Sequence, residues 1–478
     1  MADAIAELRD LLGPDLVLSQ RDELFVYECD GFTVARGVPD AVVFPESTEQ
    51  VSQCVKVLAR HGLSVVPRGS GTGLAGGAVV YDGGVMISLS RMSRIESIDF
   101  ENRVAVVQAG VRNLALSDAM AGSGWRFSPD PSSQRASSIG GNASTNAGGI
   151  NTLKHGVTTN HIIGMECVLP DGTIVQCRAN DLYDGIGADL TGLICGSEGT
   201  FCLVTRLWCR LVPEPKAIRT VYAVFDSVTS ACKSVADVIA AGMVPASMEM
   251  MDGGMIQAVE QAFHFGFPDD VAAMLLLEID GVDDVLDEQM DQIVGICVEN
   301  QATDTQKCAD PARRAELWAA RKKAFGAVGR MSHSYCTQDA CLPRSMLPEA
   351  MAHIAELGKK WDITITNVFH AGDGNIHPIM LFDEDDPEEV QRVLLLSVEV
   401  LEYCVDIGGT ITGEHGVGIE KLHLMNKQFS ADTLDAFLEL KKTFDPDQRL
   451  NDAKLVPSDR MTIEILKPVA ANVPGGAM

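Results

Sequence analysis

The glycine-dense segment at residues 67–77 narrows the possible folds more than any other part of this chain. It contains the residues of a formal G-x-G-x-x-G motif, Gly71, Gly73 and Gly76. That motif indicates a dinucleotide-binding Rossmann turn only when a helix follows, and residues 78–89 instead predict strand, turn and strand. The Rossmann interpretation therefore fails, although consecutive backbone N–H groups in such a loop suit a diphosphate. Pro67 and Arg68 anchor one end, which argues against a mobile loop.

The residues before this segment predict a βαβ unit. Residues 41–44 and 64–67 are expected to be strands, and the helix between them begins at a capping box made by Ser47 and Gln50. Four apolar residues at helical spacing form one buried stripe on that helix: Val51, Cys54, Val55 and Leu58.

Two further polar loops follow in the same half of the chain, at residues 129–149 and 196–200. The first is rich in hydroxyl, amide and glycine residues and is too long to be an idle turn. Between them, residues 165–177 predict a β-hairpin with an Asp-Gly tip. Three such loops on a strand-rich domain indicate one extended ligand with a diphosphate and a polar ring.

The composition excludes several classes of protein. The 66 acidic and 38 basic residues give a net charge of −28, which argues against nucleic acid or an anionic membrane surface as a partner. The 13 cysteines contain no C-x-x-C pair, so we expect reduced thiols in a cytoplasmic protein rather than an iron–sulfur or structural zinc site. The N-terminus lacks the pattern of a signal peptide, and no apolar run is long enough for a transmembrane segment.

A chain of 478 residues is expected to fold as at least two domains. The pattern changes at residues 213–215, and we place a boundary there. The first domain then covers residues 1–213, with a core at about 38–213, and the second covers 214–456. Residues 457–478 are expected to form a flexible tail.

Strands and helices alternate in the second domain. This alternation predicts an α+β domain whose sheet is covered by helices on one face. The expected strands are at 221–225 and 273–279, and the expected helices are at 227–241, 284–300, 311–327 and 387–407, with one more that starts at 348 and one that ends at 444.

A histidine-containing segment, residues 367–378, carries the first candidate site. Asp373-Gly374 predicts a two-residue type I′ turn, which needs a positive φ at both residues. This turn would place His370 opposite His377 on one face of a hairpin, with Cβ atoms roughly 5 Å apart. The two imidazoles could then contact one metal ion or one small polar substrate. Alternatively, they could be hydrogen-bonded core residues.

A second polar motif, residues 413–418, supplies Glu414 and His415 at a glycine-rich turn. Two histidines and a glutamate are a plausible ligand set for a divalent metal, and His415 would remain as a base. Residues 321–323 form the dense basic cluster of this region, although such clusters are usually solvated.

These segments resemble known families. Residues 67–77, 129–149 and 196–200 resemble the flavin-binding loops of the vanillyl-alcohol-oxidase (PCMH-type) FAD fold. Residues 369–377 and 413–418 resemble the signature of its FAD-linked D-2-hydroxyacid dehydrogenases, most of all the D subunits of bacterial glycolate oxidases. The resemblance covers roughly residues 20 to 456.

The resemblance implies a PCMH-type FAD-binding domain followed by an α+β cap domain that holds the substrate. It implies FAD, bound without a covalent link because the first loop has no histidine. The flavin contacts are expected at Pro67, Arg68, Gly69, Ser70, Gly71, Thr72, Gly73, Leu74, Pro129, Asp130, Gly140, Gly141, Asn142, Thr145, Asn146, Gly148, Glu198, Gly199 and Asn451.

The resemblance also implies residue roles in the oxidation of a 2-hydroxy acid. His370, His377 and Glu414 would bind a divalent metal such as zinc, and His415 would take the hydroxyl proton. Arg321 would grip the substrate carboxylate. These roles suit chemistry in which a proton leaves oxygen and a hydride leaves carbon for flavin N5.

Two positions depart from the family's pattern. Enzymes for longer dicarboxylic hydroxyacids carry an additional lysine near residues 337–343, which is lacking here and favours glycolate or D-lactate. The usual Leu-Asn-Pro-Gly-Lys is replaced by Leu-Asn-Asp-Ala-Lys at residues 450–454, so that the local turn must differ.

The resemblance implies partners as well. Electrons would leave FAD for flavin and iron–sulfur partner subunits of a glycolate oxidase complex or for a quinone, and such subunits could hold the cytoplasmic chain at the inner membrane. The alternatives are a non-catalytic flavin-binding electron-transfer subunit, a D-2-hydroxyglutarate-type dehydrogenase, and a metal-binding protein without flavin.

Overall fold

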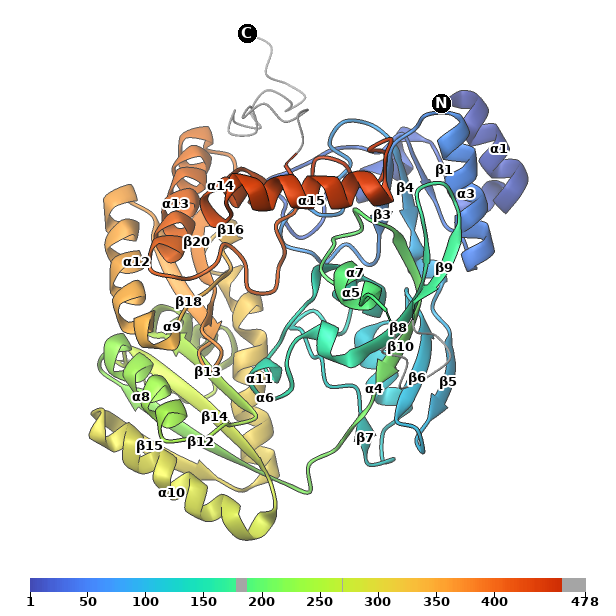
Figure 1. The fold of residues 1–478 in the computed structure, drawn as a ribbon. Coiled ribbons are helices and arrows are strands. Elements are labelled where there is room, and N and C mark those ends of the chain that lie inside the picture. The colour runs from blue at the N-terminus through green and yellow to red at the C-terminus, as the bar shows by residue number, and fades with distance from the viewer. Residues whose placement is uncertain (178–186, 269, 458–478) are drawn as a thin grey trace. The chain divides into compact units, whose positions relative to one another are not determined.

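The computed structural model describes residues 1–177, 187–268 and 270–457, so that the predicted tail from residue 458 lies outside the described residues. The chain forms two compact units (Figure 1). Unit 1 consists of Met1–Gly148, Gly156–Glu214 and the segment that begins at Glu414. Unit 2 consists of Gly149–His155 and Pro215–Gly413. Both units combine helices and sheets, which confirms the α+β class.

The first sheet of unit 1 has the strand order β1-β2-β4-β3, with β2 and β3 both parallel to β4. Its strands are β1 (Val17–Leu18), β2 (Ala41–Val43), β3 (Val65–Arg68) and β4 (Val85–Ser88). Helix α3 (Thr48–Arg60) connects β2 to β3, and the Ser47 side chain accepts a hydrogen bond from the Gln50 backbone. The predicted βαβ unit and its cap are confirmed.

The second sheet of unit 1 is antiparallel, with the order β5-β6-β10-β8-β9. It contains β5 (Ile95–Asp99), β6 (Val104–Gln108), β8 (Ile162–Val168), β9 (Ile174–Cys177) and β10 (Leu203–Arg210). Met165 lies opposite Cys177, which confirms the predicted hairpin. One hydrophobic core contains residues of both sheets and of the helices α1 (Ala2–Leu12), α3, α4 (Asn113–Ala119) and α5 (Ile139–Thr145).

Residues 78–81 do not form the strand that the sequence predicts. Val79 and Val80 are buried, yet they pair with no strand in the described part of the chain. The Val79 N–H donates instead to the carbonyl oxygen of Gly76. Apolar residues in this stretch therefore mark burial rather than strand pairing.

The chain returns to unit 1 at Glu414 and forms α14 (Met425–Gln428) and α15 (Ala431–Phe444). After α15, the Asn451 N–H donates to the carbonyl oxygen of Val65, and the Val65 N–H donates to that of Arg449. Lys441, a buried residue of α15, donates to the carbonyl oxygen of Thr200. The predicted second domain ran to residue 456, whereas packing assigns the segment from Glu414 to unit 1.

Unit 2 is built on a sheet with the order β15-β12-β14-β13-β18-β19-β17, and β20 pairs with both β16 and β18. Its pairings are antiparallel. The strands are β12 (Ala217–Phe225), β13 (Ser247–Asp252), β14 (Ala273–Gly281), β15 (Ala302–Cys308), β16 (Ser334–Thr337), β17 (Ala340–Cys341), β18 (Thr364–His370), β19 (Asn375–Ile376) and β20 (Pro378–Phe382).

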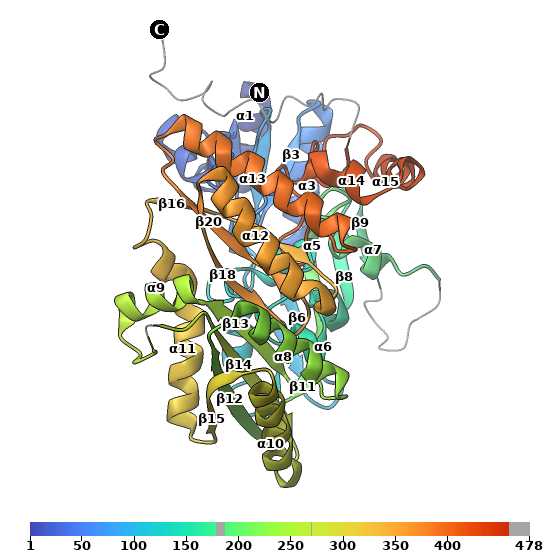
Figure 2. The ribbon, with the colours of Figure 1, turned by 90° about the vertical axis from the view of Figure 1, so that its left-hand side faces the viewer.

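Helices cover both faces of this sheet, so the prediction of one covered face is wrong. Tyr222 and Val224 of β12 pack in a core with α9 (Gly253–Phe263) and α11 (Pro311–Val328). Val221 and Ala223, which point to the opposite face, are buried as well. On that face α8 (Val228–Ala240) and α10 (Asp283–Glu299) contact β12, while α12 (Leu347–Trp361) contacts β18 and α13 (Pro387–Asp406) contacts β20 (Figure 2). Among the described helices, none is both long and apolar enough to cross a membrane.

Candidate active site

The glycine loop after β3 presents its backbone N–H groups as the sequence predicts. Within the described residues, no protein acceptor takes a hydrogen bond from the backbone N–H groups of residues 70–74. Gly71 adopts a φ of 70°, which favours glycine. At Gly69 a Cβ would lie 2.4 Å from Oγ of Ser138. A close-packed loop with unused N–H donors fits a diphosphate, as FAD requires.

Arg68 supports this loop from its side. Its Nη1 donates to the carbonyl oxygen of Cys29 at 2.8 Å, and its guanidinium lies 5.7 Å from the ring centroid of Tyr27. Burial lowers the pKa of Arg68, an effect that nearby Asp30 opposes. At Gly71 a Cβ would lie 2.1 Å from Nη2 of Arg68. The guanidinium is therefore an anchor of the loop, and its partners at residues 27–30 were not among the predicted site residues.

The second loop is fixed by a chain of buried amides. Asn142 donates to Oδ1 of Asn113 at 3.0 Å, and Asn113 donates to the carbonyl oxygen of Pro129 at 2.8 Å. Gly140 packs so closely on Ala109 that a Cβ would lie 2.6 Å from the alanine Cβ. The side chain of Asn142 thus shapes the loop, with Asn113 as a partner that sequence reasoning missed.

The remaining predicted residues of this loop lie around α5. Asn146 ends the helix in a left-handed conformation, and its Oδ1 accepts a hydrogen bond from the Thr159 backbone at 2.9 Å. Thr145 donates to the carbonyl oxygen of Gly141 at 3.3 Å. Gly148 is buried, and Asp130 is half-buried.

Glu198 holds the turn that carries Glu414 and His415. Its carboxylate accepts hydrogen bonds from the N–H groups of Val417 at 2.6 Å and Gly418 at 2.7 Å. Burial raises the pKa of Glu198, and these two N–H groups lower it only in part. Glu198 therefore fixes a turn of the protein itself.

Two neighbours complete this arrangement in unit 1. Asn451 donates to the carbonyl oxygens of Glu198 at 2.6 Å and Gly77 at 3.1 Å. At Gly199 a Cβ would lie 2.5 Å from Cγ of Pro67. The third glycine loop is thus packed directly on the first.

The turn at residues 414–418 also rests on the first glycine loop. The N–H groups of Ile419 and Glu420 both donate to the carbonyl oxygen of Ala75, at 2.9 Å and 3.2 Å. His415 Nε2 lies 3.9 Å from a carboxylate oxygen of Glu414, and both side chains are about nine-tenths buried. The predicted base and the predicted carboxylate ligand are thus built on the loops of unit 1.

The two histidines of unit 2 lie on one face of a hairpin whose register differs from the prediction. His370 pairs with Asn375, and Asn367 pairs with Pro378, so that residues 371–374 form the connection. Gly374 has a φ of 82° while Asp373 has no positive φ, which excludes a type I′ turn. A shift of two residues leaves each side chain on its face.

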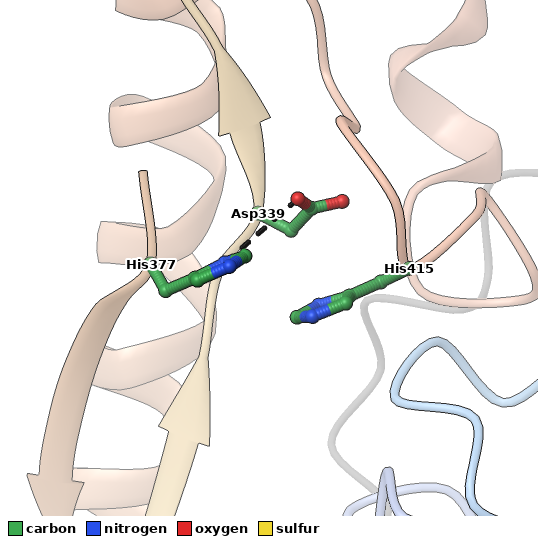
Figure 3. Close-up of side chains that lie close together, drawn as sticks. All are labelled: Asp339, His377 and His415. Carbon is green, nitrogen blue, oxygen red and sulfur yellow. Dashed lines mark ion pairs between the residues drawn. The ribbon is translucent and has the colours of Figure 1, made fainter. Parts of the chain in front are cut away.

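The histidine rings accordingly still meet. The ring centroids of His370 and His377 lie 5.3 Å apart with an interplanar angle of 87°, and both side chains are buried. Oδ1 of Asp339 lies 3.8 Å from Nδ1 of His377 (Figure 3). Its carboxylate accepts a hydrogen bond from the N–H of Gly413 at 2.8 Å. The prediction that the two imidazoles lie close together on one face of the hairpin is confirmed, whereas the predicted direct pairing of His370 with His377 is wrong, because the two residues are diagonal neighbours.

Arg321 and His370 share a partner that the sequence analysis missed. Nε and Nη2 of Arg321 lie 2.8 Å and 2.6 Å from one carboxylate oxygen of Glu249, and His370 Nδ1 lies 2.7 Å from the other. The exposed fractions of Glu249 and Arg321 are both 2%. Glu249 could have been noticed because it is a charged residue between two methionines in β13, where a buried carboxylate needs a partner.

The predicted chemistry is thus divided between two sets of residues. Unit 2 brings His370, His377, Arg321, Glu249 and Asp339 together, and unit 1 brings together Glu414 and His415. Imidazole and carboxylate groups are suitable ligands for zinc, so the donor set fits a divalent metal chemically.

The family model for FAD linked oxidases, C-terminal domain, matches residues 214–455, and an FAD binding domain model matches residues 39–178. The chain is 43% identical to the glycolate oxidase subunit GlcD of Escherichia coli (strain K12), which covers 92% of this chain and 88% of that protein. It is 36% identical to the protein of the same name from Bacillus subtilis (strain 168), over 96% of this chain and 97% of that protein. A mitochondrial D-lactate dehydrogenase [cytochrome] of Arabidopsis thaliana is 29% identical, over 95% of this chain and 80% of that protein.

Solved structures share the fold. A 4-ethylphenol oxidase from Gulosibacter chungangensis superimposes with a TM-score of 0.79 at 19% identity, over 96% of this chain and 97% of that one. A p-cresol methylhydroxylase with substrate bound also reaches a TM-score of 0.79, at 17% identity, over 95% of this chain and 96% of that one.

Proposed function

Because this chain belongs to the family of FAD-linked oxidases, we propose that it oxidises a small 2-hydroxy acid, glycolate or D-lactate, to the corresponding 2-oxo acid. FAD supplies the hydride acceptor, its N5 atom, when bound. Relatives that are named glycolate oxidase subunits and D-lactate dehydrogenases support this choice of substrate.

The observation that carries the proposal is the cluster in unit 2, where two buried imidazoles and a buried guanidinium lie together. A 2-hydroxy acid presents a carboxylate and a neighbouring hydroxyl, and these are groups that a guanidinium and a metal-binding histidine pair recognise. Arg321 directs Nε and Nη2 at Glu249, and a guanidinium has further N–H donors with which to bind the substrate carboxylate.

We assign His415 as the acceptor of the hydroxyl proton and His370, His377 and Glu414 as the ligands of a divalent metal. Such a cation would supply positive charge that lowers the pKa of the substrate hydroxyl. The turn on which His415 lies is fixed by Glu198, which suits a base that must keep its position. The hydrogen bonds to Ala75 hold the same turn on the glycine loop.

The residues at 337–343 favour a small substrate. This segment has no lysine or arginine, and its Asp339 is a fully buried carboxylate. A second carboxylate of a longer hydroxy acid would find no cation there. Glycolate and D-lactate have only one carboxylate.

The electrons are proposed to pass to a partner subunit with iron–sulfur clusters or to a quinone. The absence of any C-x-x-C pair in the sequence agrees with an acceptor outside this chain. We place the protein in the cytoplasm, with partner subunits as the means of holding it at a membrane.

A visible absorption spectrum tests this function. The purified protein is mixed anaerobically with glycolate, D-lactate or D-2-hydroxyglutarate, and the flavin band is followed. We expect glycolate or D-lactate to bleach it. His415→Ala should retain flavin, but substrate should reduce that flavin at least about 100-fold more slowly, as expected when a general base is removed. His333→Ala is the matched control, because His333 is an exposed residue in a loop.

Each other outcome contradicts one part of the proposal. Rapid reduction of His415→Ala contradicts the assignment of the base. Flavin that no hydroxy acid reduces points to a non-catalytic electron-transfer subunit. Reduction by D-2-hydroxyglutarate alone contradicts the preference for a small substrate.

A further inference from the structure

The buried carboxylate of Glu249 contacts both His370, a proposed metal ligand, and Arg321, the proposed binding residue for the substrate carboxylate. Its Oε2 lies 2.8 Å from Nε and 2.6 Å from Nη2 of Arg321, while its Oε1 lies 2.7 Å from Nδ1 of His370. We propose that Glu249 is a positioning residue that holds His370 for metal binding through Nε2 and at the same time orients Arg321 for the substrate carboxylate. This inference rests on the proposed function.

The contact with Glu249 determines which nitrogen of His370 carries a proton. An ionised carboxylate can only accept hydrogen bonds, so Nδ1 must be the donor in this 2.7 Å contact. In a neutral imidazole the lone pair is then on Nε2. Metal-binding histidines commonly donate their other N–H to a carboxylate in this way, which fixes the ring and makes it a better ligand.

The environment of Glu249 favours its ionised carboxylate, which accepts from Arg321 and His370. Arg321 is permanently cationic, and it offsets the Glu249 anion in a place where both side chains are only 2% exposed. The ionised carboxylate can therefore accept from Arg321 and from Nδ1 of His370 at the same time.

The same contact limits how Arg321 can move. Arg321 belongs to α11, whereas Glu249 and His370 lie on the paired strands β13 and β18, where Glu249 is directly opposite His370. The pair therefore ties the helix to the sheet through one carboxylate. Because a rigidly placed guanidinium loses less freedom on binding, Glu249 should also improve the grip on the substrate carboxylate.

An ion pair of purely structural value would not need the histidine. The neighbouring pair of Arg314 and Glu278 also connects α11 to the sheet, with an Nε–Oε2 distance of 2.9 Å. That pair shows that α11 can be held without a histidine. In Glu249, by contrast, one oxygen is directed at each partner, as expected for a residue that aligns both.

The test compares two isosteric substitutions on β13 in the full chain with flavin bound. Glu249→Gln removes the charge and changes one oxygen into a donor, and Asp252→Asn does the same at the end of the strand. Asp252 is buried and accepts hydrogen bonds from Thr366, Asn367 and Met255. The affinity for zinc is measured by competition with a chromogenic chelator, and steady-state rates are measured with glycolate and D-lactate.

We expect Glu249→Gln to weaken zinc binding about 10- to 100-fold, the range known for residues that orient metal ligands. We also expect KM for the hydroxy acid to rise in this variant more than kcat falls. Asp252→Asn should leave zinc affinity within about twofold. Unchanged zinc affinity in Glu249→Gln would overturn the inference.

Two further variants keep the outcomes separate. Glu249→Asp keeps the charge but withdraws the carboxylate by one methylene, and it should give a smaller loss than Gln, so it serves if the Gln variant does not fold. His370→Ala should lose tight zinc binding altogether. If His370→Ala still binds zinc as tightly, the proposed metal site itself fails, and that result differs from a failure of Glu249 alone.

Discussion

Glu198 in unit 1 and Glu249 in unit 2 are both buried glutamates, yet their surroundings shift their pKa values in opposite directions. Burial raises the pKa of Glu198, and the N–H groups of Val417 and Gly418 only partly offset it. Burial acts on Glu249 in the same sense, but His370 and Arg321 outweigh it and lower the pKa. Neutral amides fix a carboxylate in place, while a permanently charged partner such as Arg321 also favours its ionised form.

This difference separates two ways of holding functional residues. Glu198 holds a backbone turn, so that the position of His415 follows from main-chain hydrogen bonds. Glu249 holds side chains, so that His370 and Arg321 depend on a single anion. Substitutions in unit 2 should therefore act through charge, and substitutions at Glu198 through unsatisfied N–H groups.

The largest effect is expected when the charged pair is broken. Arg321→Met leaves Glu249 buried without its cation, and removal of one partner of a buried ion pair costs about 3–5 kcal/mol of unfolding free energy. Arg321→Lys should cost less, because lysine keeps the charge but cannot place two N–H groups on one carboxylate. Urea unfolding of both variants measures the difference.

The exposed pair of Arg313 and Glu316 on the same helix serves as the control. Arg313→Met should change stability by less than about 1 kcal/mol, as surface ion pairs do. Equal losses in Arg321→Met and Arg313→Met would remove the distinction between Glu249 and an ordinary ion pair.

A smaller loss of stability is expected when the hydrogen bonds between Glu198 and the turn at residues 414–418 are removed. Glu198→Ala leaves the N–H groups of Val417 and Gly418 buried without their acceptor, at about 1–3 kcal/mol for each group. Glu198→Gln should lose about half as much unfolding free energy as Glu198→Ala, because the single amide oxygen of glutamine can accept from only one of these two N–H groups. Thermal unfolding and flavin content measure both.

Glu439→Ala is the matched control in unit 1, since Glu439 is exposed and its side chain forms an ion pair with Lys442 three residues along the same helix. It should change stability by no more than about 0.5 kcal/mol. A Glu198→Ala protein that is as stable as this control would show that the turn does not depend on Glu198.

Features that depend on neighbouring residues could be predicted from the sequence. The Ser47 cap and the buried stripe of α3 follow from local helix rules, and the hairpin at 165–177 follows from turn chemistry. The glycine loop could be recognised because the Rossmann helix is missing after it. Its unused N–H groups at residues 70–74 agree with that analysis.

The His370 hairpin shows where local rules end. Asp373-Gly374 indicates a tight turn, but at Gly374 a Cβ would lie only 2.1 Å from the carbonyl oxygen of Leu342. The Leu342 N–H also donates to the carbonyl oxygen of Gly374. A contact 32 residues away in the sequence thus shapes the connection. The side on which the histidines lie could still be predicted, because a shift of two residues preserves the face.

Long-range partners of charged and amide groups could not be predicted. Glu249 meets Arg321 across 72 residues and His370 across 121, and Asn142 meets Asn113 across 29. No local pattern encodes such pairs. The packing of the segment after Glu414 on unit 1 is of the same kind, because its hydrogen bonds reach Val65, Ala75 and Glu198.

The smallest change in stability is expected at Lys454, a buried cation near Glu198. Its Nζ donates to the carbonyl oxygen of Val79 and to Oδ1 of Asn451, each at 2.6 Å. Burial lowers the pKa of Lys454 to about 7, although Asp30 and Glu198 oppose that shift. Unlike Arg321, this cation can lose its proton near neutral pH.

The sign of the pH dependence follows from the lowered pKa. Between about pH 7 and pH 10 the unfolded state keeps the lysine proton while the folded state has released it, so stability rises with pH. One such group contributes roughly 1.4 kcal/mol of unfolding free energy per pH unit within this window. Lys454→Met removes the contribution, and the difference between wild type and variant should grow as pH rises from about 7 to 9. Lys442→Met, at an exposed residue of unit 1, should leave the pH profile unchanged, and parallel profiles for wild type and Lys454→Met would contradict the assignment.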